Sequence, residues 1–136
     1  MKKLILFLTL SLSLLGSDIA KKLNYYTDYD KALKASIQAD KPLMLVQVTE
    51  YCPWCRKLEE STLCGKDIKR IVSERFIPLL VFRDKSEFPK KFRTPRVPTI
   101  FFIKGKTEEG YWEGIGYMEK DELFNNLEIA LKMYDE

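Results

Sequence analysis

Apolar positions along the chain recur with two different periods, and these predict helices and strands. Apolar residues stand at helical spacing over 28–39 and 119–134, and the same spacing follows Asp67. Short apolar runs bounded by turn residues are typical of buried strands. The three clearest runs occupy 43–48, 77–82 and 99–103.

The remaining segments complete the order of elements. A turn at 104–106 leads from the third strand to a hairpin partner at 110–115. Another helix is expected over 53–62, and Cys64 and Gly65 interrupt it before Asp67 caps the next helix. The resulting order is a helix, a strand, two helices, three strands and a closing helix, which predicts an α/β sandwich around one sheet.

The first residues of the chain differ from this pattern. Two lysines precede an uncharged apolar run over 4–15, and Gly16 and Ser17 follow it. A basic head, an apolar middle and a small-residue exit are typical of a secretory signal peptide, and the run is shorter than the roughly 20 residues of a membrane-spanning helix. We therefore predict a signal peptide at 1–17, cleaved between residues 16 and 20. An uncleaved anchor facing the periplasm is the alternative.

The composition of the chain excludes several classes of function. The chain has 136 residues, enough for one domain, here expected at 18–136, and 46% of them are apolar. Its 23 basic and 20 acidic residues give a charge of +3, which offers no electrostatic basis for nucleic-acid binding. Histidine is absent, so Ser-His-Asp triads, Cys-His dyads and His-ligated metals are excluded. The main reactive groups are three cysteines.

Cys52 and Cys55 stand where a strand gives way to a helix, with Pro53 suited to the first helical position. A cysteine at the N-cap lies near unpaired N–H groups and the positive end of the helix dipole. Its thiolate, which is the reactive form, is therefore stabilised. We expect Cys52 to be the nucleophile and Cys55 to resolve the mixed disulfide.

Other roles for this pair are weaker. A structural disulfide closing so short a loop adds little stability through the unfolded state. A zinc site needs a second pair or histidines, and only Cys64 is left to help. A buried inert pair conflicts with the exposed start of a helix. No cofactor or metal is therefore expected beyond the redox-active disulfide itself, which persists outside the cytoplasm.

A second motif precedes the strand at 99–103. Val97 and Pro98 stand at its start, where proline is tolerated. A proline in this position can follow a cis peptide bond or simply begin the strand in the trans form. The residues alone leave both forms open.

Taken together, three segments resemble the thioredoxin-fold family: LMLVQVTEYCPWC at 43–55, RVPTIFFIKGK at 96–106 and YWEGIGYMEKDEL at 111–123. The resemblance implies a central mixed sheet flanked by helices, with an extra N-terminal helix. It implies a cis Pro98 facing the cysteine pair and a Val97 backbone that binds extended substrate as an added strand. Expected substrate-binding residues are Tyr51, Pro53, Trp54, Val97 and Pro98, and the expected substrates are protein dithiols and disulfides.

The segment at 55–84 is similar to periplasmic thioredoxin-like reductases, including the C-terminal domain of the transmembrane conductor DsbD. The short spacing from Cys55 to Pro98 leaves no room for the helical insertion of DsbA-type oxidases, and no dimerisation domain precedes it. The resemblance implies a monomeric periplasmic reductase served by a membrane-bound electron donor or acceptor. A disulfide-forming oxidant and a non-catalytic binding module are the alternatives.

The sequence departs from the family at two functional positions. Val46 replaces a buried aspartate, so another group must take the proton of Cys55. Glu59 shares a helix face with both cysteines, and an acid at the matching position occurs in the DsbD domain; we nominate Glu59, with Glu50 as a weaker candidate. A solvated helix charge is the alternative for Glu59. Cys64 is an odd cysteine, which is either buried in apolar surroundings, an auxiliary redox thiol or a partner in an intermolecular disulfide.

Overall fold

The computed structural model describes residues 17–136, so the predicted signal peptide lies outside the described residues except for Ser17. The helices are α1 (Ser17–Leu23), α2 (Tyr29–Ala39), α3 (Pro53–Lys57), α4 (Lys66–Arg75) and α5 (Lys120–Asp135). A π-helical turn, η1 (Leu58–Thr62), follows α3, and a 3-10 turn, η2 (Lys90–Phe92), lies between β2 and β3. The strands are β1 (Leu43–Val48), β2 (Ile77–Phe82), β3 (Thr99–Lys104) and β4 (Glu109–Ile115).

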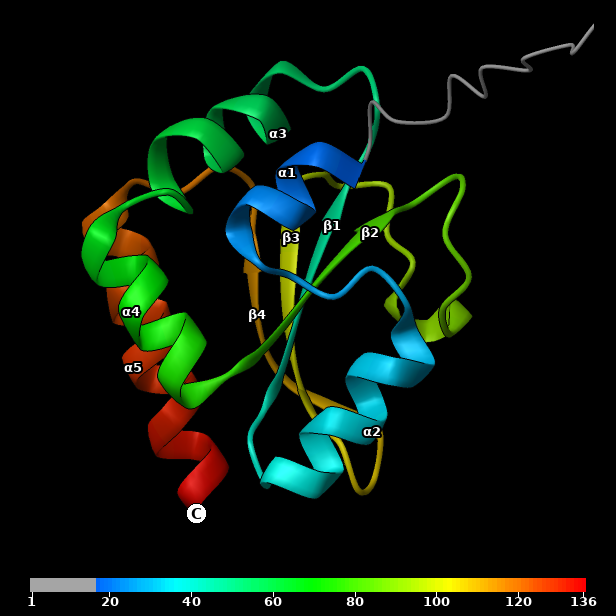
Figure 1. Cartoon of the computed structure of the whole chain (residues 1–136), viewed down its shortest axis with the longest axis vertical. Helices are drawn as coiled ribbons and strands as arrows, with labels where there is room; N and C mark the ends of the chain where they lie inside the picture. Colours follow the sequence, from blue (N-terminus) through cyan, green and yellow to red (C-terminus); the bar gives the residue numbers. More distant parts are fainter. Residues whose placement is uncertain (1–16) are drawn as a thin grey trace, which may run out of the picture.

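The four strands form one mixed sheet in the order β2-β1-β3-β4 (Figure 1). Strand β1 pairs in parallel with β2 and antiparallel with β3, and β3 pairs antiparallel with β4. The predicted bounds of β1 and β2 are confirmed to the residue. All six residues of β1 are buried, which is why this central strand reads as a continuous apolar run.

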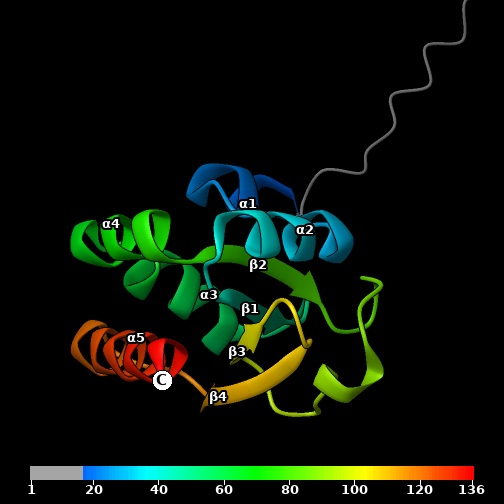
Figure 2. The same cartoon turned by 90° about the horizontal axis from the view of Figure 1, so that it is seen from below.

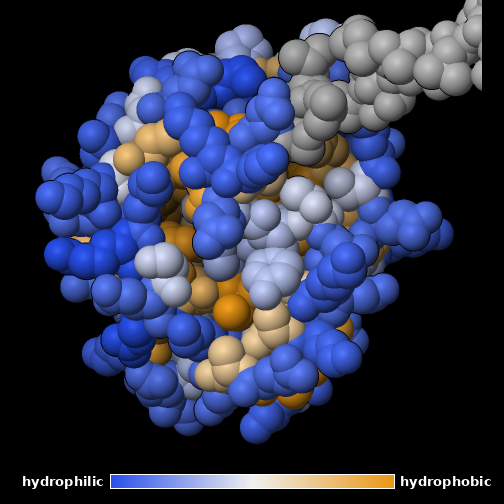
Figure 3. All heavy atoms as spheres, viewed as in Figure 1, coloured by the Kyte–Doolittle hydropathy of each residue, from blue (hydrophilic) through white to orange (hydrophobic). Residues whose placement is uncertain are grey.

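Alternate residues of β1 supply two apolar cores. Met44, Val46 and Val48 belong to a cluster that includes side chains of α1, α3, α4 and α5. Leu43 and Leu45 belong to a second cluster with α2 and the loop at 83–97. Figure 2 shows α4 and α5 side by side and α2 next to β2. In Figure 3 the face toward the viewer is mostly hydrophilic, with small apolar patches between the helices.

Local interactions explain where the helices begin. Asp28 caps α2 by accepting a hydrogen bond from the backbone N–H of Lys31, 2.9 Å away. The prediction that Asp67 caps α4 is wrong: Gly65 is the N-cap, and Asp67 lies in the first turn. An acidic side chain there still complements the helix dipole.

The helix predicted over 53–62 changes type partway. It is α-helical to Lys57 and then makes a π turn, in which the N–H of Leu63 bonds the carbonyl of Leu58 five residues earlier. The buried hydroxyl of Thr62 donates to the carbonyl of Met118, 2.7 Å away, which ties this turn to the segment before α5. The π turn leaves Glu59 buried.

Gln47 fixes the loop that leads to β3. This fully buried side chain donates to the carbonyl of Phe92, 2.7 Å away, and accepts from the N–H of Thr94 at 3.1 Å. Because a buried amide must find such partners, the polar residue within β1 selects the course of the 83–97 loop. No helix among residues 17–136 is both long and apolar enough to span a membrane.

Candidate active site at the Cys52–Cys55 pair

Cys52 and Cys55 form a disulfide at the start of α3, with Cα atoms 5.2 Å apart. Cys52 is the N-cap residue and Pro53 is the first helical residue, as predicted. The backbone N–H of Cys55 donates to the sulfur of Cys52, 3.1 Å away. Cys52 is half-buried, whereas Cys55 is fully buried. A partner can therefore approach the first sulfur, and the second is shielded.

Pro98 lies at the same edge of the sheet as this pair. Gln47 pairs with Thr99 across β1 and β3, so Pro98 stands next to the end of β1, from which the chain runs to Cys52. The Val97–Pro98 peptide bond is cis, which confirms the form that the family resemblance implies. The carbonyl of Pro98 accepts from the N–H of Gly116 at 2.8 Å, which brings the segment after β4 to this edge too.

Large aromatic side chains are exposed beside the disulfide. Tyr51 is 92% exposed and Trp54 is 57% exposed, and the ring of Trp54 lies 5.4 Å from that of Tyr117. Val97 is half-buried and Pro98 is buried. Solvent-facing aromatic rings of this size are typical of surfaces that bind another chain. The predicted binding residues therefore surround one edge of the sheet, with Pro53 exposed among them.

Two further residues at this surface were not found from the sequence. The ammonium group of Lys57 lies 5.1 Å from the centre of the Trp54 ring and 4.8 Å from that of Tyr117, a cation–π arrangement with both rings. Lys57 stands three residues after Trp54 on α3, a spacing that signals a contact on a helix surface. The part played by Tyr117, which is distant in sequence, has no such local signal.

Glu59 is almost fully buried, with 2% of its surface exposed. The alternative of a solvated helix charge is therefore wrong. Burial raises the pKa of Glu59 above its ordinary value, and the nearby Arg56 guanidinium opposes this rise only in part. A carboxyl group with a raised pKa is better matched to proton transfer near neutral pH than an exposed one.

Arg56 connects this carboxylate to the loop before Cys52. Its guanidinium donates to Glu59 at 2.9 Å and to the carbonyls of Thr49 and Glu50 at 3.1 and 3.5 Å. No local pattern in the sequence predicts this role of Arg56. The side chain of Glu50 turns to the surface and forms an ion pair of 2.7 Å with Lys85. Glu50 is thus engaged away from the buried carboxylate.

Cys64 is half-buried and free. Its thiol donates to the backbone carbonyl of Glu59 at 3.0 Å. It therefore caps the π turn rather than lying fully buried among apolar side chains. Within residues 17–136, no three or more Cys, Asp or Glu residues are grouped as metal ligands.

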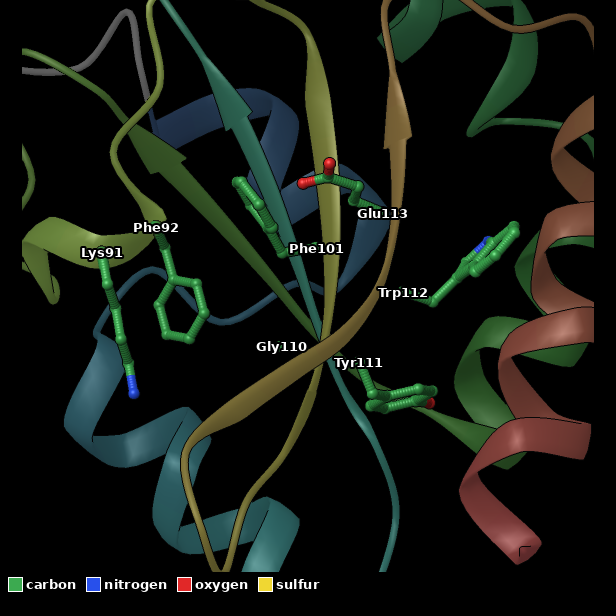
Figure 4. A pocket seen from close by; sticks show the side chains of 7 residues that line it. All are labelled: Lys91, Phe92, Phe101, Gly110, Tyr111, Trp112 and Glu113. Carbon is green, nitrogen blue, oxygen red and sulfur yellow. The ribbon is translucent and has the colours of Figure 1, made fainter.

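Two cavities differ in their relation to the disulfide. One, of about 340 Å³, lies between the segments 49–51 and 82–85 and includes Tyr51 next to Cys52. The other, of about 530 Å³, lies along β4 and includes Phe92 and Phe101 (Figure 4). None of the predicted site residues lines the second cavity, so the chemistry of the chain belongs to the first region.

Comparisons with known proteins agree with this geometry. The thioredoxin-like domain matches residues 29–130, three quarters of the chain, and the chain belongs to the thioredoxin-like family. No curated protein sequence matches it. With its CXXC cysteine pair, the chain is a thiol-disulfide oxidoreductase whose redox group is its own disulfide.

Solved structures share the fold at low sequence identity. A thioredoxin from Thermus thermophilus is 22% identical, with a TM-score of 0.67, over 77% of this chain and 85% of that one. An oxidoreductase called DsbH is 20% identical, with a TM-score of 0.59, over 79% and 84%. The oxidised C-terminal domain of Neisseria meningitidis DsbD is 17% identical, with a TM-score of 0.58, over 82% and 97%.

Proposed function

We propose that the chain reduces disulfides of proteins in a bacterial periplasm through exchange with the Cys52–Cys55 dithiol. The observation that carries this proposal is the difference between the two sulfurs. Cys52 is partly exposed at a helix N-cap, and Cys55 is buried one turn inside. In such a pair, the partly exposed sulfur exchanges with the substrate and the buried sulfur resolves the mixed disulfide.

Reduction of a substrate would proceed in two exchanges. The Cys52 thiolate attacks one sulfur of the substrate disulfide, and the other substrate sulfur leaves as a thiolate. Glu59 takes the proton of Cys55, whose thiolate then attacks the Cys52 sulfur and releases the first substrate sulfur. The substrate thiolates take up protons, from Glu59 and from water. The substrate has gained two electrons, and the chain is left with the disulfide.

The nomination of Glu59 as proton acceptor rests on its position and burial. It stands four residues after Cys55 in the helical segment formed by α3 and η1, and its side chain is buried. Burial raises its pKa, so its carboxylate is a stronger proton acceptor than that of an exposed glutamate. Val46, at the position where thioredoxins carry a buried aspartate, supplies no proton acceptor.

The first residues of the chain support the proposed periplasmic location. The basic head, the apolar run over 4–15 and the small residues after it support export and cleavage. Ala20 and Leu23 of α1 are buried in the core, so cleavage before α1 keeps this helix intact. We further propose that the chain is a monomer and that it receives its electrons from a membrane-bound dithiol partner.

The direction of transfer has one competing interpretation. Stabilising the Cys52 thiolate at a helix N-cap stabilises the reduced form, which favours an oxidant. Equilibration of the chain with glutathione buffers of graded ratio distinguishes the two. A reduction potential well below that of DsbA, roughly −120 mV, supports the reductase, and a value near it would overturn that direction.

The substrates are found by trapping. A Cys55→Ser variant exported to the periplasm should retain substrates as mixed disulfides with Cys52, because the resolving thiol is gone. A Cys52→Ser variant is the matched control and should retain none. If both variants retain the same proteins, the assignment of the two sulfurs is wrong.

A further inference from the structure

Charge is distributed unevenly around the disulfide. The 83–97 loop, which ends at the cis peptide bond, carries six basic and two acidic residues. Its net charge of +4 exceeds the +3 of the whole chain, so the rest of the molecule is slightly negative. The loop leaves β2 at the edge of the sheet from which β1 leads to Cys52, because β1 and β2 are parallel.

Three acids near this edge form ion pairs. Glu50 pairs with Lys85 at 2.7 Å, Asp84 pairs with Arg83 at 3.0 Å, and the buried Glu59 pairs with Arg56 at 2.9 Å. The remaining acid of the loop, Glu87, lies in its middle, next to Phe88. Glu50, the acid that directly precedes Tyr51, is therefore not a free carboxylate.

Two cations at the edge are not neutralised in this way. Among residues 17–136, no carboxylate lies within salt-bridge distance of Lys57 or Arg96. Lys57 is held by the rings of Trp54 and Tyr117 and is exposed. Arg96 is exposed, and its carbonyl accepts from the hydroxyl of Thr99 at 2.6 Å, which fixes its backbone next to Val97.

These two cations belong to different segments that lead to or from the cysteine pair and Pro98. Lys57 belongs to α3, which begins at the disulfide, and Arg96 belongs to the loop that leads into Pro98. Two contacts connect α3 with the segment that contains Pro98. Trp54 lies against Tyr117, and the N–H of neighbouring Gly116 bonds the carbonyl of Pro98. A segment that extends from Cys52 along Val97 would therefore meet two positive charges that have no carboxylate partner.

We propose that the preferred substrates are extended segments that carry acidic residues next to their reactive cysteine. The inference rests on the proposed exchange reaction and adds the charge of the substrate to it. Carboxylates beside the substrate sulfur would pair with Lys57 and Arg96, while Tyr51 and Trp54 contact the apolar parts of the segment. Complementary charge of this kind raises association rates and rejects segments of the same charge as the site.

Three peptides of equal length test the proposal. Each carries one cysteine in a disulfide with neutral 2-mercaptoethanol, flanked on both sides by Glu, by Gln or by Lys. The reduced chain should react with the Glu peptide about tenfold faster than with the Lys peptide at low ionic strength, with the Gln peptide between them. The gap should shrink as salt shortens the screening length. Equal rates for all three peptides would overturn the proposal.

Variants identify the responsible cations. The double variant with Lys57→Gln and Arg96→Gln should bring the ratio of the Glu and Lys peptide rates close to one. Lys132→Gln is the matched control, because Lys132 lies in the last turn of α5, at the end of the molecule far from α3 (Figure 1), and should keep the wild-type ratio. A double variant that keeps the ratio contradicts the assignment of these residues.

The proposed exchange reaction has its own readout. Reduction of the neutral bis(2-hydroxyethyl) disulfide requires Cys52 but no charge recognition, so the wild type should reduce it and Cys52→Ser should not. If this reaction fails, the proposed exchange itself is wrong. If it proceeds while the charged peptides react equally, the exchange stands and only the charge preference is wrong.

Discussion

The guanidinium of Arg56 donates a hydrogen bond of 2.9 Å to the carboxylate of Glu59, a buried acid four residues after the resolving cysteine. The same guanidinium bonds the carbonyl of Thr49 at 3.1 Å, in the loop that leads to Cys52. The Arg56 side chain therefore contacts both the loop that leads to Cys52 and the carboxylate that we propose takes the proton of Cys55.

Replacement of Glu59 by Gln should change stability in a pH-dependent way. Because burial raises the pKa of Glu59, folding favours its protonated form, and the stability this provides is lost as pH rises from about 4.5 through the raised pKa. Gln stays neutral throughout. The free energy of unfolding of Glu59→Gln, measured by urea titration, should therefore increase relative to the wild type as pH rises. A difference that is the same at all pH values contradicts the raised pKa.

The same variant should slow resolution of the mixed disulfide. Without Glu59, the proton of Cys55 must pass directly to water, and general-base catalysis typically contributes 10²-fold or more, so a loss of about this size is expected. Single-turnover release of substrate thiol, followed against pH, measures this step. Glu60→Gln is the matched control, since Glu60 is exposed and adjacent in sequence. Equal losses in both variants would remove Glu59 from the reaction.

Arg56→Met should move the pH dependence of resolution to higher pH. The guanidinium lowers the pKa of Glu59, so its removal raises that pKa further. The hydrogen bonds to the loop carbonyls are also lost, with an expected cost of about 1–2 kcal/mol in unfolding free energy. Arg56→Lys keeps the charge but not the forked donor, and should restore the pH profile more than the stability. If Arg56→Met and the wild type have the same pH profile of resolution, the effect of Arg56 on Glu59 is contradicted.

Gln47→Leu should weaken the positioning of the 83–97 loop, which leads to Val97 and Pro98. The variant removes the partners of the Phe92 carbonyl and the Thr94 N–H, and buried groups left unsatisfied cost about 1–3 kcal/mol. The expected result is lower stability together with a higher KM for protein disulfides, while the rate with a small disulfide changes less. Equal losses for protein and small substrates would mean that the amide only stabilises the fold.

Thr62→Val tests the link between the π turn and the segment carrying Tyr117. The buried hydroxyl bonds the carbonyl of Met118, and valine preserves the shape without the donor. We expect a loss of about 1 kcal/mol in unfolding free energy and weaker packing of Tyr117 on Trp54. The tryptophan fluorescence of the oxidised chain should change accordingly. Wild-type stability would show that the hydroxyl contributes nothing.

Local patterns in the sequence predicted much of this site. The bounds of β1 and β2 follow from apolar runs, and the N-cap position of Cys52 follows from a strand that ends just before Pro53. The cis form of Pro98 required the family resemblance, because the residues alone leave both isomers open. The signals for the two strands and for the N-cap depend only on residues close together in the chain.

The missed features depend on partners distant in sequence or on small shifts of the backbone. Gln47 reads as a minor interruption of a strand until its bonds to Phe92 and Thr94 are known. The π turn after Lys57 differs from an α-helix by one residue per turn, which apolar spacing does not resolve. The resemblance implied an extra N-terminal helix, but the bounds of α1 were not predicted, because only Ala20 and Leu23 mark its buried side.

The most direct test of the whole account is the ionisation of the Cys52 thiol in the reduced chain. A Cys55→Ser, Cys64→Ser background leaves one thiol, whose alkylation rate by iodoacetamide is followed against pH. The hydrogen bond from the N–H of residue 55 and the helix N-terminus should make Cys52 half-ionised at a pH clearly below the 8.5 or so of free cysteine. A midpoint at or above the value of free cysteine would contradict the assignment of Cys52 as the exchanging nucleophile.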